Sequence, residues 1–345
     1  MTLVYFVLVL GTIVLIHEFG HFIFAKKAGI YVYEFSIGMG PRLFKWTRKN
    51  DETEYSIRLI PIGGFVQMAG EEIEDDKSIP KDKKFGSKTF GQKFMAVIAG
   101  IMNNFILAIV LLFFIALFNG APANKSYVGK IDSNYPAYNS GLKTGDRILK
   151  VNNKSASNSD TLALQLQVNS GKTIKILVDR NGQEKEFSLS PKKVKIDGNE
   201  VYKYGFTIND EVNHGFFASL KYAFSKTISL LHQMVLIIFY LITGKLSVGS
   251  LSGPVGIFGV VGDAAASGFW SLISLTAFIS INVGFINLLP LPAFDGGRIL
   301  FLLIEKIKGH PVDPRIENTI HSIGLFLLMA LMILITYNDI LRLLK

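Results

Sequence analysis

Long apolar runs separated by polar stretches are the main pattern of the chain. Four of them approach the ~20 consecutive apolar residues that a helix needs to cross a bilayer. They cover Leu3 to Ala25, Phe94 to Phe118, Phe269 to Leu289 and Ile320 to Tyr337. A signal peptide is the alternative for the first run, but no basic residue precedes it and no small-residue cleavage pattern follows it. We therefore expect four membrane-spanning helices, including a retained first one.

A fifth stretch, Phe216 to Ile242, is apolar towards its end but carries Lys221, Lys226 and His232 earlier. This distribution predicts an amphipathic helix that lies on the outer membrane interface or dips into it. A fifth membrane span is the alternative, and it would move the C-terminus to the cytoplasmic side.

Basic residues flank one set of ends of the apolar runs and predict their orientation. They are Lys26, Lys27, Lys88, Lys93, Arg298, Lys306, Lys308 and Arg315. Short cytoplasmic loops carry an excess of Lys and Arg, so these ends are expected to face the cytoplasm. Both termini and residues 119–268 are then expected outside it. The lysines within that long segment do not count, because long segments cross regardless of charge.

Residues 127 to 208 change character and predict a small β-rich domain. Short alternating runs, such as Thr173 to Val178 and Glu186 to Leu189, are joined by turn signals at Asn181-Gly182 and Asp197-Gly198. The domain is inserted between the second and third apolar runs.

Within this domain, the segment from Ser133 to Asn153 resembles the loop, short helix and strand of PDZ domains in bacterial proteases. Gly141-Leu142 and Gly145-Asp146 fall where those domains turn. PDZ domains bind extended peptides by strand addition. A peptide or partner protein is therefore an expected ligand of the domain, and a spacer without a ligand is the alternative.

The composition supports a membrane protein and excludes several kinds of site. Hydrophobic residues make up 49% of the 345 residues, and the formal net charge is +9. We attribute this charge to attraction by the inner leaflet and expect no nucleic-acid partner, because no basic stripe is interleaved with aromatic residues. The chain has no cysteine, which excludes disulfides, thiolate ligands and a cysteine nucleophile. A metal site must therefore use histidines and carboxylates.

One motif inside the first apolar run carries the chemistry of a metal site. Residues 17–21 read His-Glu-Phe-Gly-His, and on a helix this spacing places His17 and His21 on one face. Glu18 can take a proton from a metal-bound water. Three ionisable side chains in a spanning helix are costly unless partnered, so the cluster indicates a functional site. Buried structural histidines are the alternative, and they would not explain the glutamate between them.

A catalytic zinc site of this kind uses three protein ligands, so a third ligand must come from elsewhere in the chain. His214 and His232 are poor candidates because they belong to the outer segment. Asp295 is better placed, since it follows the third apolar run in the segment Asn287 to Gly297. Two prolines break the helix there and two glycines permit an irregular backbone, which at membrane depth must be buried or line a cavity. A simple helix-end charge is the alternative.

The His-Glu-Phe-Gly-His motif, the segment NLLPLPAFDGG and the PDZ-like insert follow one another in the order typical of site-2 proteases. The chain resembles this family of intramembrane zinc metalloproteases over nearly its whole length, and its bacterial RseP-like type in particular. The resemblance implies a zinc ion held by His17, His21 and Asp295. It also implies that Glu18 is the general base and that Asn287 contacts the substrate or the transition state.

The resemblance further implies a β-rich element, formed by Phe35 to Pro41 and Ser56 to Met68, that dips into the membrane from the inside. A transmembrane substrate helix must unwind before cleavage, and pairing with the edge of the second segment would replace its lost hydrogen bonds. An ordinary cytoplasmic hairpin is the alternative. The expected substrate-binding residues are Asn287, Gly63, Gly64, Phe65, Val66, Gln67 and Met68.

These patterns predict a polytopic α-helical membrane protein with about four transmembrane helices, an inserted β-rich PDZ-like domain and a membrane-associated β element. Residues 1–118 would hold the first two helices, the zinc motif and the β element, and residues 119–212 the PDZ-like domain. Residues 213–268 would form the interfacial helix and a connecting loop. Residues 269–345 would hold the last two helices and the Asn287 to Gly297 motif.

The expected function is zinc-dependent cleavage of transmembrane segments of single-span membrane proteins. It would be the second cut after ectodomain trimming, on substrates such as anti-sigma factors or signal-peptide remnants. The enzyme is expected in the bacterial inner membrane, with its active site towards the cytoplasmic side and the PDZ-like domain outside. A non-catalytic membrane receptor or scaffold with a PDZ domain is the alternative. A transporter is disfavoured because no inverted repeat is visible.

Overall fold

We describe the chain from a computed structural model, over residues 1–71, 76–156, 158–196, 199–209, 211–247, 249 and 251–343. The chain divides into two compact units. The first unit comprises Met1–Leu111 with Val248–Lys345, and the second comprises Leu112–Ser247. Each unit has its own core, and each is described by itself.

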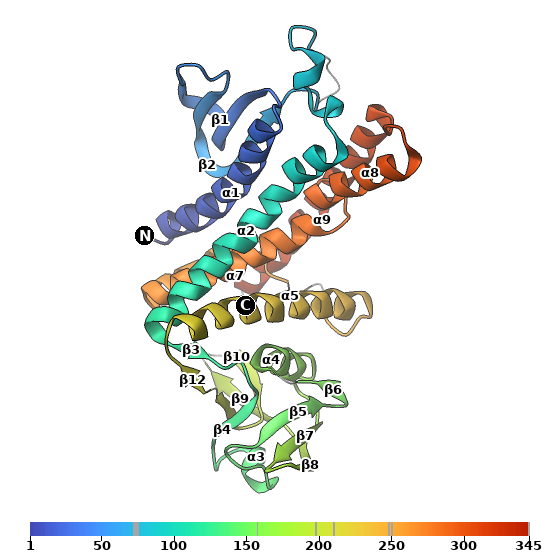
Figure 1. The fold of residues 1–345 in the computed structure, drawn as a ribbon. Coiled ribbons are helices and arrows are strands. Elements are labelled where there is room, and N and C mark those ends of the chain that lie inside the picture. Colours follow the sequence, from blue (N-terminus) through green and yellow to red (C-terminus); the bar gives the residue numbers. More distant parts are fainter. Residues whose placement is uncertain are drawn as a thin grey trace. The chain divides into compact units, whose positions relative to one another are not determined.

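The four apolar runs form helices, as their length and composition predict. These helices are α1 (Thr2–Lys27), α2 (Phe90–Asn119), α7 (Phe269–Leu288) and α9 (Pro314–Leu343) (Figure 1). Together with α5 (Phe216–Ile242), they are the five helices among the described residues that are long and apolar enough to cross a membrane. An interfacial position of α5 stays a prediction, because its length and composition also suit a span.

Residues 254–266 correct one expectation, because the sequence predicts a connecting loop after α5. They form the helix α6 (Pro254–Ala266), which is too short to cross a bilayer. Proline is favoured at the first position of a helix, where Pro254 stands. The Asp339 carboxylate, near the end of α9, accepts hydrogen bonds from the amides of Gly253 and Gly256 at 2.9 and 2.8 Å. This cap comes from a distant part of the chain, so the local sequence does not reveal it.

The segment around Asp295 also differs from its expected form. The sequence predicts irregular backbone at Gly296 and Gly297, but both lie in the first turn of the helix α8 (Asp295–Lys308). A Cβ atom at Gly296 would lie 2.2 Å from the Leu289 carbonyl oxygen. The glycine therefore permits close packing within a regular helix, and the irregular backbone is confined to residues 289–294.

The β element is present as two long antiparallel strands, β1 (Val32–Thr47) and β2 (Glu54–Met68). The strands bend so that the first half of β1 has a partner on each side. Phe35 pairs with Val66 near the end of β2 and with Tyr55 near its start. Among the described pairings, residues 64–68 have a neighbour on one side only. The end of β2 is therefore an edge strand.

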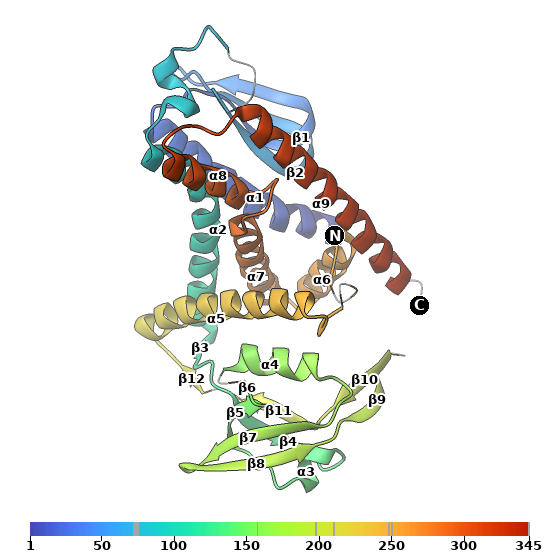
Figure 2. The same cartoon turned by 90° about the vertical axis from the view of Figure 1, so that its right-hand side faces the viewer.

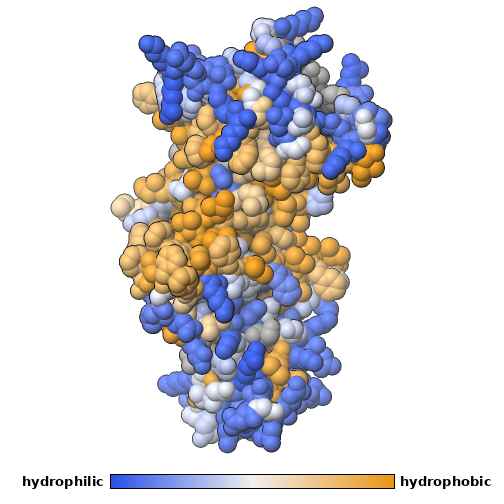
Figure 3. Space-filling view, in the orientation of Figure 1, coloured by the Kyte–Doolittle hydropathy of each residue, from blue (hydrophilic) through white to orange (hydrophobic). Residues whose placement is uncertain are grey.

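This β element packs against α2 and against α1, which carries the His-Glu-Phe-Gly-His motif, as Figures 1 and 2 show for α1. Its core contains Val32, Phe35 and Val66, which are buried together with Ala25 of α1 and Ala96 of α2. The chain reaches α2 through two short 3-10 helices, η1 (Lys81–Lys83) and η2 (Phe85–Ser87). On the visible face of this unit, apolar side chains cover the long helices. Hydrophilic ones gather over the end of the β element where β1 ends and β2 begins (Figure 3).

The second unit contains the predicted β-rich domain. Its main sheet has the order β11-β4-β5-β7-β8, with β6 paired to β5, and β3–β12 and β9–β10 form two small additional pairs. The strands are β3 (Ala121–Pro122), β4 (Tyr127–Ile131), β5 (Arg147–Val151), β6 (Lys154–Ser155), β7 (Ile174–Arg180), β8 (Gln183–Leu189), β9 (Lys192–Ile196), β10 (Asn199–Lys203), β11 (Phe206–Asn209) and β12 (Val212–Asn213). Its helices are α3 (Pro136–Asn139), α4 (Ser159–Val168) and α5.

Local sequence explains the hairpin of β7 and β8, whereas the second turn signal, Asp197-Gly198, lies outside the described residues. Asn181 and Gly182 have φ angles of 54° and 81°, the positive values that a two-residue type I′ turn requires at both positions. The core beneath the hairpin contains Ile148, Ile176 and Leu162, the last from α4. A β-rich domain is thus confirmed, and its identity as a PDZ domain stays a prediction.

Candidate active site

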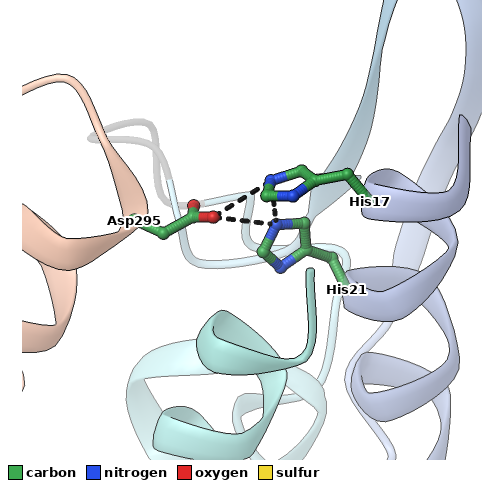
Figure 4. A group of neighbouring side chains, drawn as sticks. All are labelled: His17, His21 and Asp295. Atoms are coloured by element: carbon green, nitrogen blue, oxygen red, sulfur yellow. Dashed lines mark hydrogen bonds and ion pairs between the residues drawn. The ribbon is translucent and has the colours of Figure 1, made fainter. Parts of the chain in front are cut away.

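The helix α1 presents two imidazoles to the interior of the first unit. His17 and His21 lie one turn apart, as the spacing of the motif predicts, and both side chains are buried. Their Nε2 atoms are 3.1 Å apart. Figure 4 shows the two rings projecting from successive turns of the same helix towards a third residue.

The third residue is Asp295, the first residue of α8. Its Oδ2 atom lies 3.0 Å from Nε2 of His17 and 3.3 Å from Nε2 of His21 (Figure 4). The structure therefore brings together the three residues that the sequence analysis selected from positions almost 280 residues apart.

Two imidazoles and one carboxylate are a donor set that suits zinc. The three candidate ligand atoms lie within 4.8 Å of one another. Although Oδ2 of Asp295 is buried, it makes no hydrogen bond of good geometry with any described residue. A buried carboxylate oxygen without such a partner is costly in an apolar interior, and coordination of a metal ion would satisfy it. The residues present therefore fit the metal.

Second contacts hold both imidazoles in the orientation that a metal requires. Nδ1 of His21 lies 2.9 Å from the Ala96 carbonyl oxygen, so Nδ1 donates and the Nε2 lone pair faces Asp295. Nδ1 of His17 lies 3.2 Å from the side-chain amide of Asn104. The oxygen and nitrogen of such an amide are interchangeable by rotation. With its Oδ1 turned towards His17, Asn104 would accept the Nδ1 proton and free Nε2 in the same way.

Two glycines allow α1 and α2 to cross closely at the site. A Cβ atom at Gly20 would lie 2.4 Å from the Ala99 carbonyl oxygen, and one at Gly100 would lie 2.3 Å from Nε2 of His21. Small residues at a helix crossing let the backbones approach one another, and this is common in membrane proteins. Here the backbone of α2 forms one wall of the site directly against the His21 ring.

A cavity of about 700 Å³ opens beside the three candidate ligands. Glu18 lines it together with His17, His21 and Asp295. All of the residues that the sequence analysis expects to bind substrate also line it, namely Asn287, Gly63, Gly64, Phe65, Val66, Gln67 and Met68. Gly64 lies close to Glu18, because a Cβ atom there would be 3.4 Å from the Glu18 Cγ atom. The edge strand of β2 is thus a wall of the cavity that contains the glutamate.

The loop before Asp295 is held from the last helix. The backbone amide of Ala293 donates a hydrogen bond to Nδ1 of His321 at 3.0 Å. A Cβ atom at Gly324 would lie 2.2 Å from Cβ of Pro292, so α9 approaches this loop closely. Ala293 has a φ angle of 74°, in the left-handed region that L-residues other than glycine, asparagine and aspartate rarely adopt.

The sequence analysis missed several residues of the site. Asn104, which contacts His17, interrupts an apolar span next to Asn103, and this interruption is a usable signal, because polar groups inside spans are costly without a role. Arg298 and Glu71 also line the cavity. Arg298 follows Asp295 by three residues and so lies on the same helical face, although it was considered only as a marker of orientation. Glu71 follows the edge strand and carries no comparable signal.

Comparisons with known proteins agree with this geometry. A model of the family described as "Peptidase family M50" matches residues 5–331. The zinc metalloprotease RasP of Geobacillus kaustophilus is 31% identical, over 98% of this chain and 97% of its own length. The zinc metalloprotease RasP of Bacillus licheniformis is 33% identical over 99% of both chains. The "Regulator of sigma-W protease RasP" of Bacillus subtilis is 32% identical, again over 99% of both.

Proposed function

The chain belongs to peptidase family M50 and is a zinc metalloprotease, and from this premise we propose that His17, His21 and Asp295 hold its zinc ion. The proposal rests mainly on one observation. The candidate ligand atoms of the two histidines and of Asp295 all lie within 4.8 Å of one another, as the ligand atoms of a single ion would. Family membership also favours an enzyme over the non-catalytic receptor that the sequence left open. The activity of this enzyme is regulated intramembrane proteolysis.

Glu18 is the general base of the proposed mechanism. When bound, zinc lowers the pKa of a water and polarises the scissile carbonyl group. Glu18 accepts the proton of the attacking water and then donates it to the leaving nitrogen. Its position in the same cavity as the three ligands supports this role. Asn287 lines that cavity too, where its amide can hydrogen-bond the substrate or the transition state.

The edge of β2 positions the substrate in this proposal. A helical segment hides its carbonyl groups in its own hydrogen bonds, so it must unwind to be cleaved. Strand addition at residues 64–68 would restore the lost bonds. Two observations support it: this part of β2 has a paired neighbour on one side only, and it lines the cavity that contains Glu18.

The substrates we propose are single-span proteins of the bacterial plasma membrane whose external part has already been trimmed. Anti-sigma factors are one such class, in keeping with the Bacillus subtilis relative named as a regulator of sigma-W. Signal-peptide remnants are another. In this arrangement the active site opens towards the cytoplasm, and the PDZ-like domain lies on the external side of the membrane. The domain admits short stubs and excludes folded ectodomains, and peptide capture by the domain is the rival account.

Metal analysis together with cleavage of a model substrate tests the assignment of the site. Glu18→Gln should keep about one zinc per chain and lose cleavage, because it removes the base and no ligand. Asp295→Ala should lose most of the zinc, since a three-ligand site binds far more weakly with two. Full zinc content and full cleavage in Asp295→Ala would show that the third ligand lies elsewhere.

A further inference from the structure

A second cavity of about 1080 Å³ lies in the first unit beside the proposed catalytic site. It is lined by apolar residues and by charged or titratable side chains of both signs. The charged or titratable ones are Glu71, Lys93, Asp295, Arg298, Glu305, Glu317 and His321. Such a polar lining beside apolar helices is costly to maintain unless it serves a function.

The second cavity adjoins the catalytic cavity. Glu71, Ala293, Asp295 and Arg298 line both of them, so these four residues form the wall between the two. Three of the four follow one another within a short segment at the start of α8. Arg298 is the one positively charged residue of this shared wall.

Arg298 is paired with Glu71 across the wall. Its Nη1 atom donates a hydrogen bond to Oε1 of Glu71. The Arg298 side chain is 42% exposed and the Glu71 side chain 14%. Because Arg298 lines both cavities, a second carboxylate can reach its guanidinium. An exchange of one carboxylate for another keeps the guanidinium paired, so its charge is not left without a partner.

Peptide hydrolysis creates a carboxylate close to this wall. The elements of water are added across the C–N bond, so one product ends in a carboxylate and the other begins with an amine. A new carboxylate is costly in an apolar site unless a cation receives it. Arginine binds carboxylates through two parallel N–H donors. Arg298 is suited to this task because it faces both cavities.

We propose that Arg298 receives the carboxylate of the cleaved product by exchanging it for Glu71, and that the second cavity is the exit of that product. Glu71 has the same functional group as the new chain end, so it holds Arg298 ready between turnovers and competes for it during release. The inference rests on the proposed catalytic site, but it concerns product binding rather than bond cleavage.

The test compares binding of two fluorescent peptides to the purified full-length protein. They share one short apolar sequence and differ only in ending as a free acid or as an amide. Fluorescence anisotropy should show that wild type binds the acid roughly tenfold more tightly, as expected for hydrogen bonds to a charged group. In zinc-depleted protein, wild type should keep part of this preference for the acid. Arg298→Gln should abolish that remaining part, and Arg298→Lys should retain some of it.

Glu71→Gln provides the opposite change, because it removes the competitor and should increase the preference for the acid. In the same variant steady-state cleavage should slow by a larger factor than the first turnover, because release becomes limiting. Glu305→Gln is the matched control, since Glu305 lines the second cavity but not the shared wall and is paired with Lys93 rather than Arg298. It should leave the preference as in wild type.

Zinc content and the midpoint of thermal unfolding are measured for each variant, so that loss of the proposed metal site is distinguished from loss of product binding. Three results would overturn the inference. One is an unchanged acid preference in Arg298→Gln with zinc bound. Another is no preference in zinc-depleted wild type. The third is an equal effect of Glu71→Gln and Glu305→Gln, which would indicate a general effect of charge in the cavity.

Discussion

Replacing Gly100 by alanine tests whether the backbone of α2 positions the proposed metal-binding face of α1. A Cβ atom at position 100 would lie 2.3 Å from Nε2 of His21 and 2.7 Å from Cε1. Cβ contacts shorter than 3.0 Å are essentially never found, so the ring or the backbone must move by at least about 0.7 Å. The atom in question is the proposed ligand atom itself.

The size of this displacement sets the expected effect. Metal–ligand distances tolerate deviations of about 0.2 Å, so a shift of 0.7 Å takes His21 out of coordination range. Loss of supporting interactions around a metal typically costs 10- to 100-fold in affinity. We expect Gly100→Ala to reach at least the upper figure, about 2.7 kcal/mol. The helix itself would gain up to ~1 kcal/mol from alanine, so a weaker helix cannot cause the loss.

The assay is zinc content after equilibration at a series of buffered free zinc concentrations, together with cleavage of a model substrate. Gly91→Ala is the matched control. It lies in the same helix and a Cβ atom there would meet nothing within 4 Å, so zinc affinity and cleavage should be unchanged. Wild-type zinc affinity in Gly100→Ala would refute the reasoning that the close helix crossing positions His21.

Phe65→Pro and Val66→Pro should depress cleavage with zinc content intact, because proline removes a backbone donor from the edge strand; unchanged cleavage would indicate a passive loop. The cleavage rate of model substrates with external segments of increasing length should fall sharply at a threshold length. This threshold should disappear when residues 127–208 are deleted from a protein that still binds zinc, whereas a length-independent rate in the intact enzyme would contradict size exclusion. Burial opposes ionisation of Asp146, yet Arg180, at 2.6 Å, holds the pKa of this carboxyl below its usual range. The β-rich domain should therefore keep this stabilisation above a pH of about 4 and lose it as the pH falls through the folded-state pKa. Hydrogen exchange should show that the stability of the domain depends less on acid pH in Asp146→Asn than in wild type.

The parts of the fold that the sequence predicts correctly depend on local patterns. Long apolar runs form helices, and Asn181-Gly182 forms a tight turn, because neighbouring residues determine both. Helix α6 was missed because its N-terminus is capped by Asp339, more than 80 residues away. The start of α8 was misread because Gly296 is required by contact with the Leu289 carbonyl group, and the same residue type also marks irregular backbone.

The residues of the candidate site divide in the same way, into those that a local pattern reveals and those that depend on contacts between distant segments. His17, Glu18 and His21 could be selected because one helical turn explains their spacing, and Asp295 because a charge beside broken helix at membrane depth is costly. Gly100 and Asn104 owe their roles to the crossing of α1 and α2, and no spacing rule within one segment specifies that crossing. Arg298 and Glu71 meet only when β2 and α8 come together. The catalytic roles of the selected residues stay proposals.

The left-handed conformation of Ala293 has a consequence for how the site is assembled. An alanine held at a φ angle of 74° stores about 1 kcal/mol or more of backbone strain, which a glycine would relieve. Glycine would also give the loop before Asp295 a wider choice of conformations. The strained conformation persists because α9 holds the loop, through the hydrogen bond from Ala293 to His321 and the close contact of Gly324 with Pro292. The last helix thus fixes the direction from which the Asp295 carboxylate approaches the imidazoles, and loosening α9 would free the loop to relax away from the proposed metal site.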